Sequence, residues 1–220
     1  MLLYHRPTSG HSYKACLLLS ILGIKFESVF VQANGGKNIV NDEYLELNPR
    51  GQVPTLEDDG TTIWGSTAIL VYLASKFDKH RTWLPADPGQ TAAVMQWMEF
   101  AQNEVNGLFL SRAIQKFGYS GDLVAAQRAG NAALDILEDR LGRHHWLACD
   151  WPTIGDIACF PYAAVADDNG FDLQGRPALN RWFKRMIQLR GFFPMPGMEP
   201  LVARLTEERK LTASVSATNF

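Results

Sequence analysis

The sequence predicts an α/β domain with the order β-α-β-α-β-β-α, followed by an all-α domain. Three observations lead to this prediction. Strand and helix patterns alternate up to about residue 80, two prolines interrupt the chain soon afterwards, and every later pattern has helical spacing. We therefore expect an α/β domain over residues 1–79, a linker over residues 80–89 and a helical domain over residues 90–220.

Each element of the first part has a local signal. Short apolar, β-branched or aromatic runs predict strands at residues 2–5, 26–31, 54–56 and 61–64. Apolar residues at helical spacing predict helices at residues 12–22, 42–47 and 66–77. Between the last two strands, Asp58-Asp59-Gly60 predicts a tight hairpin, because Gly60 tolerates a positive φ.

The second part has only helical patterns. They predict helices at residues 90–117, 122–141, 153–166 and 177–189. Thr153 and Asp156 have the spacing of a capping box, which predicts the start of the third of these helices. From about residue 206 large apolar side chains are few, so we expect a frayed tail.

Composition limits the possible functions. The net charge is −2 without a run of like charges, whereas nucleic acid and anionic membranes both require a basic face. The sequence contains no apolar run long enough to span a bilayer and no signal-peptide pattern. Three cysteines without a CxxC or Cys/His cluster indicate neither a disulfide framework nor a metal site, and they fit a reducing cytoplasm.

One segment, residues 48–74, combines several features of an anion site. It contains a turn, a Val53-Pro54 pair at the head of a strand, a hairpin and a helix that begins at Ser66. Backbone groups and a helix N-terminus directed to one place can hold small anionic peptides or phosphates. We therefore expect a ligand site here, with its chemistry supplied by the first ten or so residues.

The same residues carry a family resemblance. The chain reads NPRGQVPTL and GSTAILVYLA in the first part, then WPTIGDIA and PALNRWFKR in the helical part. In this combination the chain resembles the glutathione S-transferase family over essentially its whole length. The resemblance implies a thioredoxin-like N-terminal domain, a helical C-terminal domain and a homodimeric cytoplasmic enzyme of detoxification. It also implies glutathione as co-substrate, a hydrophobic electrophile as second substrate, and no metal.

The resemblance further assigns glutathione-binding residues. It implies a cis peptide bond between Val53 and Pro54, with the Val53 backbone pairing with the cysteinyl part of glutathione. It places the γ-glutamyl carboxylate at the helix start formed by Ser66 and Thr67. At the glycyl end it implies Gln52 and Lys37.

One position departs from the family pattern. Most relatives have Glu or Asp immediately before the serine, to hold the γ-glutamyl ammonium, and this chain has Gly65. Either another carboxylate serves, for example one from a partner subunit, or glutathione binds weakly.

The loop after the first strand supplies the catalytic candidates. Ser9, five residues before Lys14, matches the family's hydroxyl that donates to the glutathione sulfur and favours the thiolate. His11 replaces a frequent Asn and is a second candidate donor. Other hydroxyls remain open as the donor or as the helix cap, namely Thr8, Ser12 and Tyr4. Cys16 lies further along the predicted helix and is interpreted as a core thiol.

The second substrate is expected between the two domains, where pockets commonly lie. The candidate pocket residues are Phe100, Asn103 and Phe109, with Glu104, Phe117 and Tyr119 nearby. The predicted reaction is conjugation of the glutathione thiolate to a small electrophile. The alternatives are a glutathione-dependent disulfide reductase or peroxidase on the same fold, and a non-catalytic binding protein.

Overall fold

A small mixed sheet forms the first part of the protein. The computed structural model describes residues 1–34, 37–38 and 40–207. The sheet contains β1 (Leu2–His5), β2 (Glu27–Phe30), β5 (Thr55–Asp58) and β6 (Thr61–Trp64), in the order β2-β1-β5-β6. β1 is parallel to β2 and antiparallel to β5, and β5 is antiparallel to β6. The parallel pair and the antiparallel hairpin are as predicted, whereas the pairing of β1 with β5 was not predicted.

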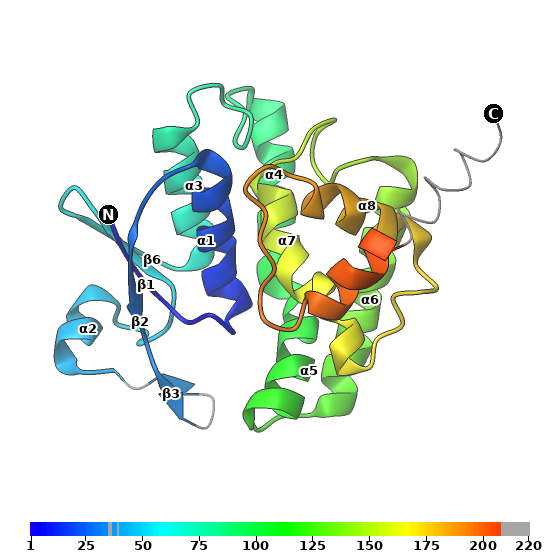
Figure 1. Cartoon of the computed structure of the whole chain (residues 1–220), viewed down its shortest axis with the longest axis horizontal. Helices are drawn as coiled ribbons and strands as arrows, with labels where there is room; N and C mark the ends of the chain where they lie inside the picture. Colours follow the sequence, from blue (N-terminus) through cyan, green and yellow to red (C-terminus); the bar gives the residue numbers. More distant parts are fainter. Residues whose placement is uncertain (35–36, 39, 208–220) are drawn as a thin grey trace.

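Helices cover this sheet. They are α1 (Gly10–Leu22), α2 (Asp42–Leu47) and α3 (Ser66–Phe77). Figure 1 shows α1 and α3 between the sheet and the helical part, with α2 on the opposite side. A short hairpin of β3 (Ala33–Asn34) and β4 (Lys37–Asn38) precedes α2 and was not predicted, because each strand has only two residues.

The rest of the described chain is helical. Its elements are α4 (Pro88–Asn103), α5 (Asn106–Phe117), α6 (Leu123–Arg143), α7 (Ile154–Ala164), the 3₁₀ turn η1 (Asp167–Asn169) and α8 (Pro177–Ile187). Residues 199–207 are also helical and were not predicted; Leu201 and Leu205 anchor them in the core. Most of the expected frayed tail, residues 208–220, lies outside the described residues.

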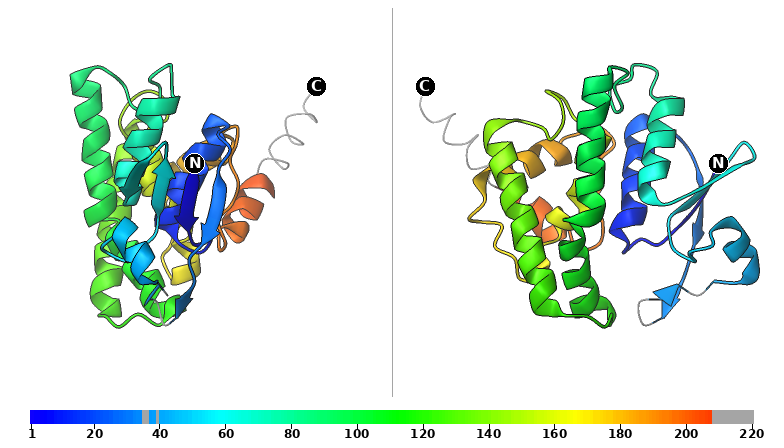
Figure 2. Two further views of the ribbon diagram at one scale, coloured as in Figure 1. Left: turned by 90° about the vertical axis from the view of Figure 1, so that its left-hand side faces the viewer. Right: turned by 180° about the vertical axis from the view of Figure 1, so that it is seen from behind.

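The single helix expected over residues 90–117 is wrong. It is divided into α4 and α5 at Glu104 and Val105, whose amides both donate to the Phe100 carbonyl. Helix α5 lies alongside α6, as the right-hand view of Figure 2 shows. The two helices approach closely at Gly107, where a Cβ would lie 2.6 Å from the Gly130 nitrogen.

Helix α7 joins the two parts. Every residue of α7 is buried, and the helix packs against α1, α3, α4 and α5. A helix that is apolar all round is stable only inside a core. One hydrophobic core therefore runs from the sheet through α7 to α8, and it holds the loop after β1 against the helical part.

Candidate functional site

Ser9 begins α1 and has a hydroxyl proton available for a ligand. Its Oγ accepts a hydrogen bond from the Ser12 amide at 3.2 Å, so Ser9 is the N-cap of a helix that starts two residues earlier than predicted. The Ser9 proton has no acceptor within the described residues. A hydroxyl can accept and donate at once, so the residue that caps α1 can also donate to a ligand.

Two of the three competing hydroxyls, those of Ser12 and Tyr4, have other partners. Ser12 is completely buried, and its Oγ accepts from the Arg6 amide at 3.3 Å. Tyr4 donates to Glu57 at 2.8 Å, and burial raises its pKa to about 12. The Thr8 carbonyl accepts from Arg112 at 2.9 Å. Because Ser12 is completely buried and Tyr4 donates to Glu57, the hydroxyls that can still donate to a ligand beside the start of α1 are those of Ser9 and Thr8.

A pocket that we call the Val53 pocket lies between this helix start, the turn before β5 and the start of α3. It is lined by His11, Asn48, Arg50, Gln52, Val53, Pro54, Trp64, Gly65, Ser66 and Gln102. It thus brings together His11 with Gln52, Val53, Pro54 and Ser66 of the sequence-predicted set. Lys37 lies in β4, and its side chain is outside the part of the structure that is described.

The turn that presents Val53 is held from behind. The Gln52 carbonyl accepts hydrogen bonds from Asn48 Nδ2 at 2.7 Å and from the Tyr44 hydroxyl at 2.6 Å. The Val53–Pro54 bond is cis, as the resemblance implies. The Val53 amide and carbonyl form no hydrogen bond within the described residues, so they are open to an added extended peptide.

The start of α3 forms the opposite wall. Gly65 is its N-cap at φ 88° and ψ 129°, a backbone conformation in which a residue with a side chain would be strained. A Cβ on Gly65 would meet no atom within 4 Å, so the space that an acidic side chain would occupy is open. Gln102 of α4 reaches this wall and donates to Thr67 Oγ1 at 2.8 Å and Ser66 Oγ at 3.4 Å.

His11 connects the Val53 pocket with Ser9. Its Nδ1 lies 3.3 Å from Ser66 Oγ. Burial lowers the pKa of His11 well below its ordinary value, and the charges of Lys14 and Arg50 act in the same direction, so the ring is neutral at pH 7. Because Ser66 accepts from Gln102, its own proton can go to Nδ1, which leaves Nε2–H of His11 as a donor.

A second pocket, which we call the Ser9 pocket, lies on the other side of His11. Its lining combines the loop after β1 with α5 and α7 and consists of Arg6, Thr8, Ser9, Phe109, Arg112, Phe117, Tyr119 and Tyr162. The His11 ring packs against Phe109 and Tyr162, with centroids 5.5 and 5.2 Å away. Of the predicted second-substrate residues, Phe109 therefore lies beside Ser9.

Phe100 and Asn103 lie elsewhere. Phe100 packs on Trp97 at 5.2 Å and lines a separate groove between α4 and α6, together with Arg140 and Leu147. Asn103 is exposed at the end of α4 and lines neither the Val53 pocket nor the Ser9 pocket. The break after α4 changes the direction of the chain, so spacing along one assumed helix could not predict these positions.

Sequence reasoning missed Tyr162. Its hydroxyl accepts from the His11 amide at 3.3 Å, and burial raises its pKa, so it stays protonated at pH 7. Tyr162 also requires Gly10, where a Cβ would lie 2.6 Å from the ring. The sequence did contain a sign of this role. Tyr162 has a hydroxyl in an otherwise apolar helix, and a buried tyrosine hydroxyl needs a hydrogen-bond partner.

Lys14 is a completely buried cation behind the site. Its Nζ has no hydrogen-bond partner among the described residues and lies 5.8 Å from the centre of the Tyr162 ring. Burial lowers its pKa to about 8. Lys14 is therefore still mostly charged at pH 7, close to the aromatic residues around His11.

The described residues provide neither a metal site nor a membrane-spanning helix. They contain no group of three or more His, Cys, Asp or Glu side chains arranged to hold a metal ion. None of the helices in the described ranges has the length and apolar character needed to cross a membrane.

Comparison with known proteins identifies the family. Residues 3–81 match the family model described as glutathione S-transferase, N-terminal domain, and residues 109–185 match glutathione S-transferase, C-terminal domain. Glutathione S-transferase GstB of Escherichia coli (strain K12) is 27% identical over 194 residues, which cover 84% of this chain and 92% of that protein. Glutathione S-transferase D6 of Drosophila melanogaster is 25% identical and 96% of each chain is covered.

Solved structures give the same result. A glutathione S-transferase from Pseudomonas fluorescens superposes with a TM-score of 0.80 at 33% identity, over 89% of this chain and 98% of that one. One from Xanthobacter autotrophicus has a TM-score of 0.80 at 31% identity, over 91% and 98%. With both family models, this identity and the predicted fold in agreement, the chain belongs to the glutathione S-transferase family.

Proposed function

We propose that this protein is a glutathione transferase, which joins the thiol of glutathione to a small hydrophobic electrophile. One observation carries the proposal: a hydroxyl with an available proton, Ser9, begins a helix beside a pocket that contains an unpaired backbone segment at Val53. The relatives named above bear the name of this activity, which supports the assignment.

The Val53 pocket has groups that fit each part of glutathione. The amide and carbonyl of Val53 would pair with the cysteinyl residue in the manner of an added strand. Ser66 and Thr67, at the N-terminus of α3, would hold the γ-glutamyl carboxylate, because the helix dipole and the first-turn amides favour an anion. Gln52 and Lys37 are proposed for the glycyl end, and Pro54 shapes the turn between the two walls.

The chemistry is nucleophilic substitution or addition by the thiolate. The thiol proton leaves to solvent, and the Ser9 hydroxyl and the start of α1 stabilise the remaining negative charge on sulfur. His11 Nε2–H is a second donor. The sulfur then forms a bond to the electrophilic carbon, and the leaving group departs with its electron pair. Positioning of the two reactants supplies a further part of the rate.

The mouth of the Ser9 pocket is the proposed place of the electrophile, because the enclosed space of about 10 Å³ is too small for an aromatic ring. Phe109 supplies an aromatic wall next to Ser9, and Tyr162 supplies a second one. In this proposal residues 1–79 bind glutathione, residues 80–89 connect the domains, and the helical domain over residues 90–220 supplies the wall of the second site. Phe100 and Asn103 remain candidates only for contacts outside this pocket.

Cysteine-based disulfide or peroxide chemistry has less support. Cys16 is buried in α1, and burial raises its pKa to about 12. A redox-active cysteine requires an accessible thiol with a lowered pKa. The hydroxyl of Ser9 therefore fits conjugation better than either alternative function.

We further propose a homodimer that works in detoxification in the cytoplasm. Exposed large apolar side chains at Trp64, on a wall of the Val53 pocket, and at Met95 on α4 offer area for a second copy. The three cysteines are free thiols, which fits a reducing compartment. Light scattering coupled to gel filtration tests the dimer, and a single-chain mass at micromolar concentration contradicts it.

Calorimetric titration with glutathione tests the proposed function most simply. We expect binding that is weakened by Ser66→Ala and unchanged by Ser75→Ala, an exposed serine on the same helix. Mass spectrometry should then detect the glutathione conjugate of 1-chloro-2,4-dinitrobenzene. A protein that does not bind glutathione at millimolar concentration contradicts the proposal.

A further inference from the structure

We propose that the preferred second substrate carries a carboxylate or a similar small oxyanion, and that Arg112 binds this group. The inference rests on the proposed function, because it concerns the substrate class of the Ser9 pocket. It begins from a cation that the folded chain buries without a matching anion.

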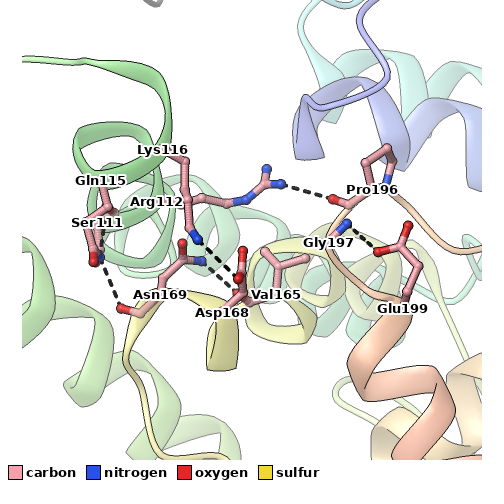
Figure 3. A network of polar contacts seen from close by, with 10 residues as sticks. All are labelled: Ser111, Arg112, Gln115, Lys116, Val165, Asp168, Asn169, Pro196, Gly197 and Glu199. Atoms are coloured by element: carbon pink, nitrogen blue, oxygen red, sulfur yellow. Dashed lines mark hydrogen bonds and ion pairs between the residues drawn. The ribbon is translucent and has the colours of Figure 1, made fainter.

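Arg112 is held at the junction of three segments. It is 5% exposed on α5, Nη1 donates to the Thr8 carbonyl at 2.9 Å, and Nη2 donates to the Pro196 carbonyl at 3.0 Å. Figure 3 shows the side chain extended from α5 toward Pro196. The Phe117 ring lies 5.0 Å from the guanidinium carbon. The guanidinium is thus oriented by two carbonyls and an aromatic face.

The charge of Arg112 has no ion-pair partner among the described residues, and the nearby carboxylate of Asp168 acts on it only at longer range. The Nε of Arg112 is buried without a hydrogen-bond partner within the described ranges. The carboxylate nearby, Asp168, pairs with Lys116 at 3.2 Å. A buried charge without an ion-pair partner destabilises a fold, so a guanidinium is expected to gain an anion from elsewhere.

The Ser9 pocket is where that anion would enter. Arg112 lines the same pocket as Ser9, and its partner Thr8 directly precedes Ser9 in the chain. The pocket lining contains two guanidinium groups, Arg6 and Arg112, and no carboxylate. Its remaining walls are mainly aromatic. The enclosed space of the pocket is only about 10 Å³, so a small oxyanion would enter it toward Arg112, while the ring of an aromatic electrophile would lie at its mouth beside Phe109.

Two electrophiles of nearly equal shape test this inference, 4-chloro-3-nitrobenzoate and 4-chloro-3-nitrobenzamide. With each, the thiolate forms a carbon–sulfur bond at the ring carbon, and chloride leaves with the electron pair of the broken carbon–chlorine bond. After division by the uncatalysed rate of each compound, we expect kcat/KM to favour the carboxylate about tenfold or more, which is the usual value of a charge-assisted contact.

Variants of Arg112 test whether this side chain causes the preference for the carboxylate compound. Arg112→Gln should abolish it, mainly through a higher KM for the benzoate, while kcat/KM for the benzamide changes less than about twofold. Arg112→Lys should keep part of the preference. Arg128→Gln is the matched control, because Arg128 is an exposed guanidinium on the neighbouring helix α6 and lies outside the pocket; kcat/KM for both compounds should stay unchanged.

The outcomes that overturn the inference are distinct. Equal normalised kcat/KM for the two compounds with the unmodified protein overturns it, whether or not Arg112→Gln folds. An equal loss for both compounds in Arg112→Gln, with a raised pKa of the bound thiol, assigns Arg112 to the sulfur or to the fold and also overturns it.

Binding separates this inference from the proposed function. If neither compound is conjugated, calorimetry compares 4-nitrobenzoate with 4-nitrobenzamide on the same protein. Tighter binding of the benzoate that is lost in Arg112→Gln supports an anion site in a protein without the proposed activity. Equal binding, or no binding of either compound, overturns the anion site as well.

Discussion

His11 Nδ1 lies 3.3 Å from Ser66 Oγ, and this contact joins the starts of α1 and α3. Both helices direct their N-termini to the same region, so their dipoles act on a common ligand. One helix begins at the proposed thiolate donor and the other at the proposed carboxylate anchor. The distance between these two helix starts would therefore determine which extended conformation of glutathione can reach both of them.

Ser9→Ala removes the cap of α1 and the proposed thiolate donor together. We expect kcat/KM for conjugation to fall about 10²-fold, as for loss of one preorganised donor. We also expect the free energy of unfolding to fall by about 1 kcal/mol, because the Ser12 amide loses its acceptor. Steady-state kinetics and urea unfolding measure the two effects.

Ser9→Thr is the control, since threonine keeps both the cap and the hydroxyl. Its activity should stay within about tenfold of the original protein. Normal activity in Ser9→Ala would contradict the assignment of Ser9 and favour His11 as the donor.

His11 should make the protein sensitive to acid. Burial lowers its pKa in the folded chain, whereas the unfolded chain takes up a proton near the ordinary value of about 6.5. The unfolded state therefore binds more protons below this pH, so the stability present above about pH 6.5 is lost as the pH falls. Melting temperatures between about pH 7.5 and pH 5 should decrease less in His11→Gln than in the original protein.

His144→Gln is the matched control, because His144 is exposed. It should leave the acid-dependent decrease unchanged. A decrease of equal size in the original protein and in His11→Gln would show that His11 does not control the acid response.

Gly65→Asp should strengthen glutathione binding and weaken the fold. The backbone at Gly65 strains any side chain by about 1–3 kcal/mol, although a Cβ there meets no neighbouring atom. A carboxylate at this point would face the γ-glutamyl ammonium, so we expect up to about fivefold tighter binding in calorimetry. Gly65→Asn has the same strain without the charge, and equal affinity in the two variants would refute the ammonium contact.

Asp156→Asn should destabilise the helical part. The buried carboxylate accepts from the Thr153 amide at 2.9 Å, the Leu147 amide at 3.1 Å and Trp182 Nε1 at 3.0 Å. An amide would turn donor hydrogens toward these donors, so we expect a loss of about 3 kcal/mol in urea unfolding. Asp150→Asn, on an exposed residue, should cost little. If the free energy of unfolding falls as little in Asp156→Asn as in Asp150→Asn, the capping box of Thr153 and Asp156 does not stabilise the fold.

Local patterns predicted much of the fold and part of the candidate site. The order of strands and helices along the first part of the chain, the Thr153 capping box and the helix that begins at Ser66 follow from residues a few positions apart. Such signals depend on backbone geometry alone, so a single sequence contains them. The cap of α1 was not predicted, because the sequence offers Thr8 and Ser12 as caps and the structure has Ser9.

Contacts between distant segments could not be predicted in this way. Gln102 and Tyr162 reach the Val53 and Ser9 pockets because α4 ends at Glu104 and α7 packs on α1. The direction of those side chains depends on tertiary packing, which spacing along one helix does not contain. Arg112 had no local signal either, since its partners Thr8 and Pro196 lie in other parts of the chain.

The pKa of the glutathione thiol in the complex tests the central claim most directly. Thiolate absorbance is followed while the pH is raised, with the original protein and with Ser9→Ala, each saturated with glutathione. The account predicts a bound thiol pKa at least about one unit below the free value near 8.5, with most of the shift lost in Ser9→Ala. A bound thiol that titrates like free glutathione in the original protein would contradict the account.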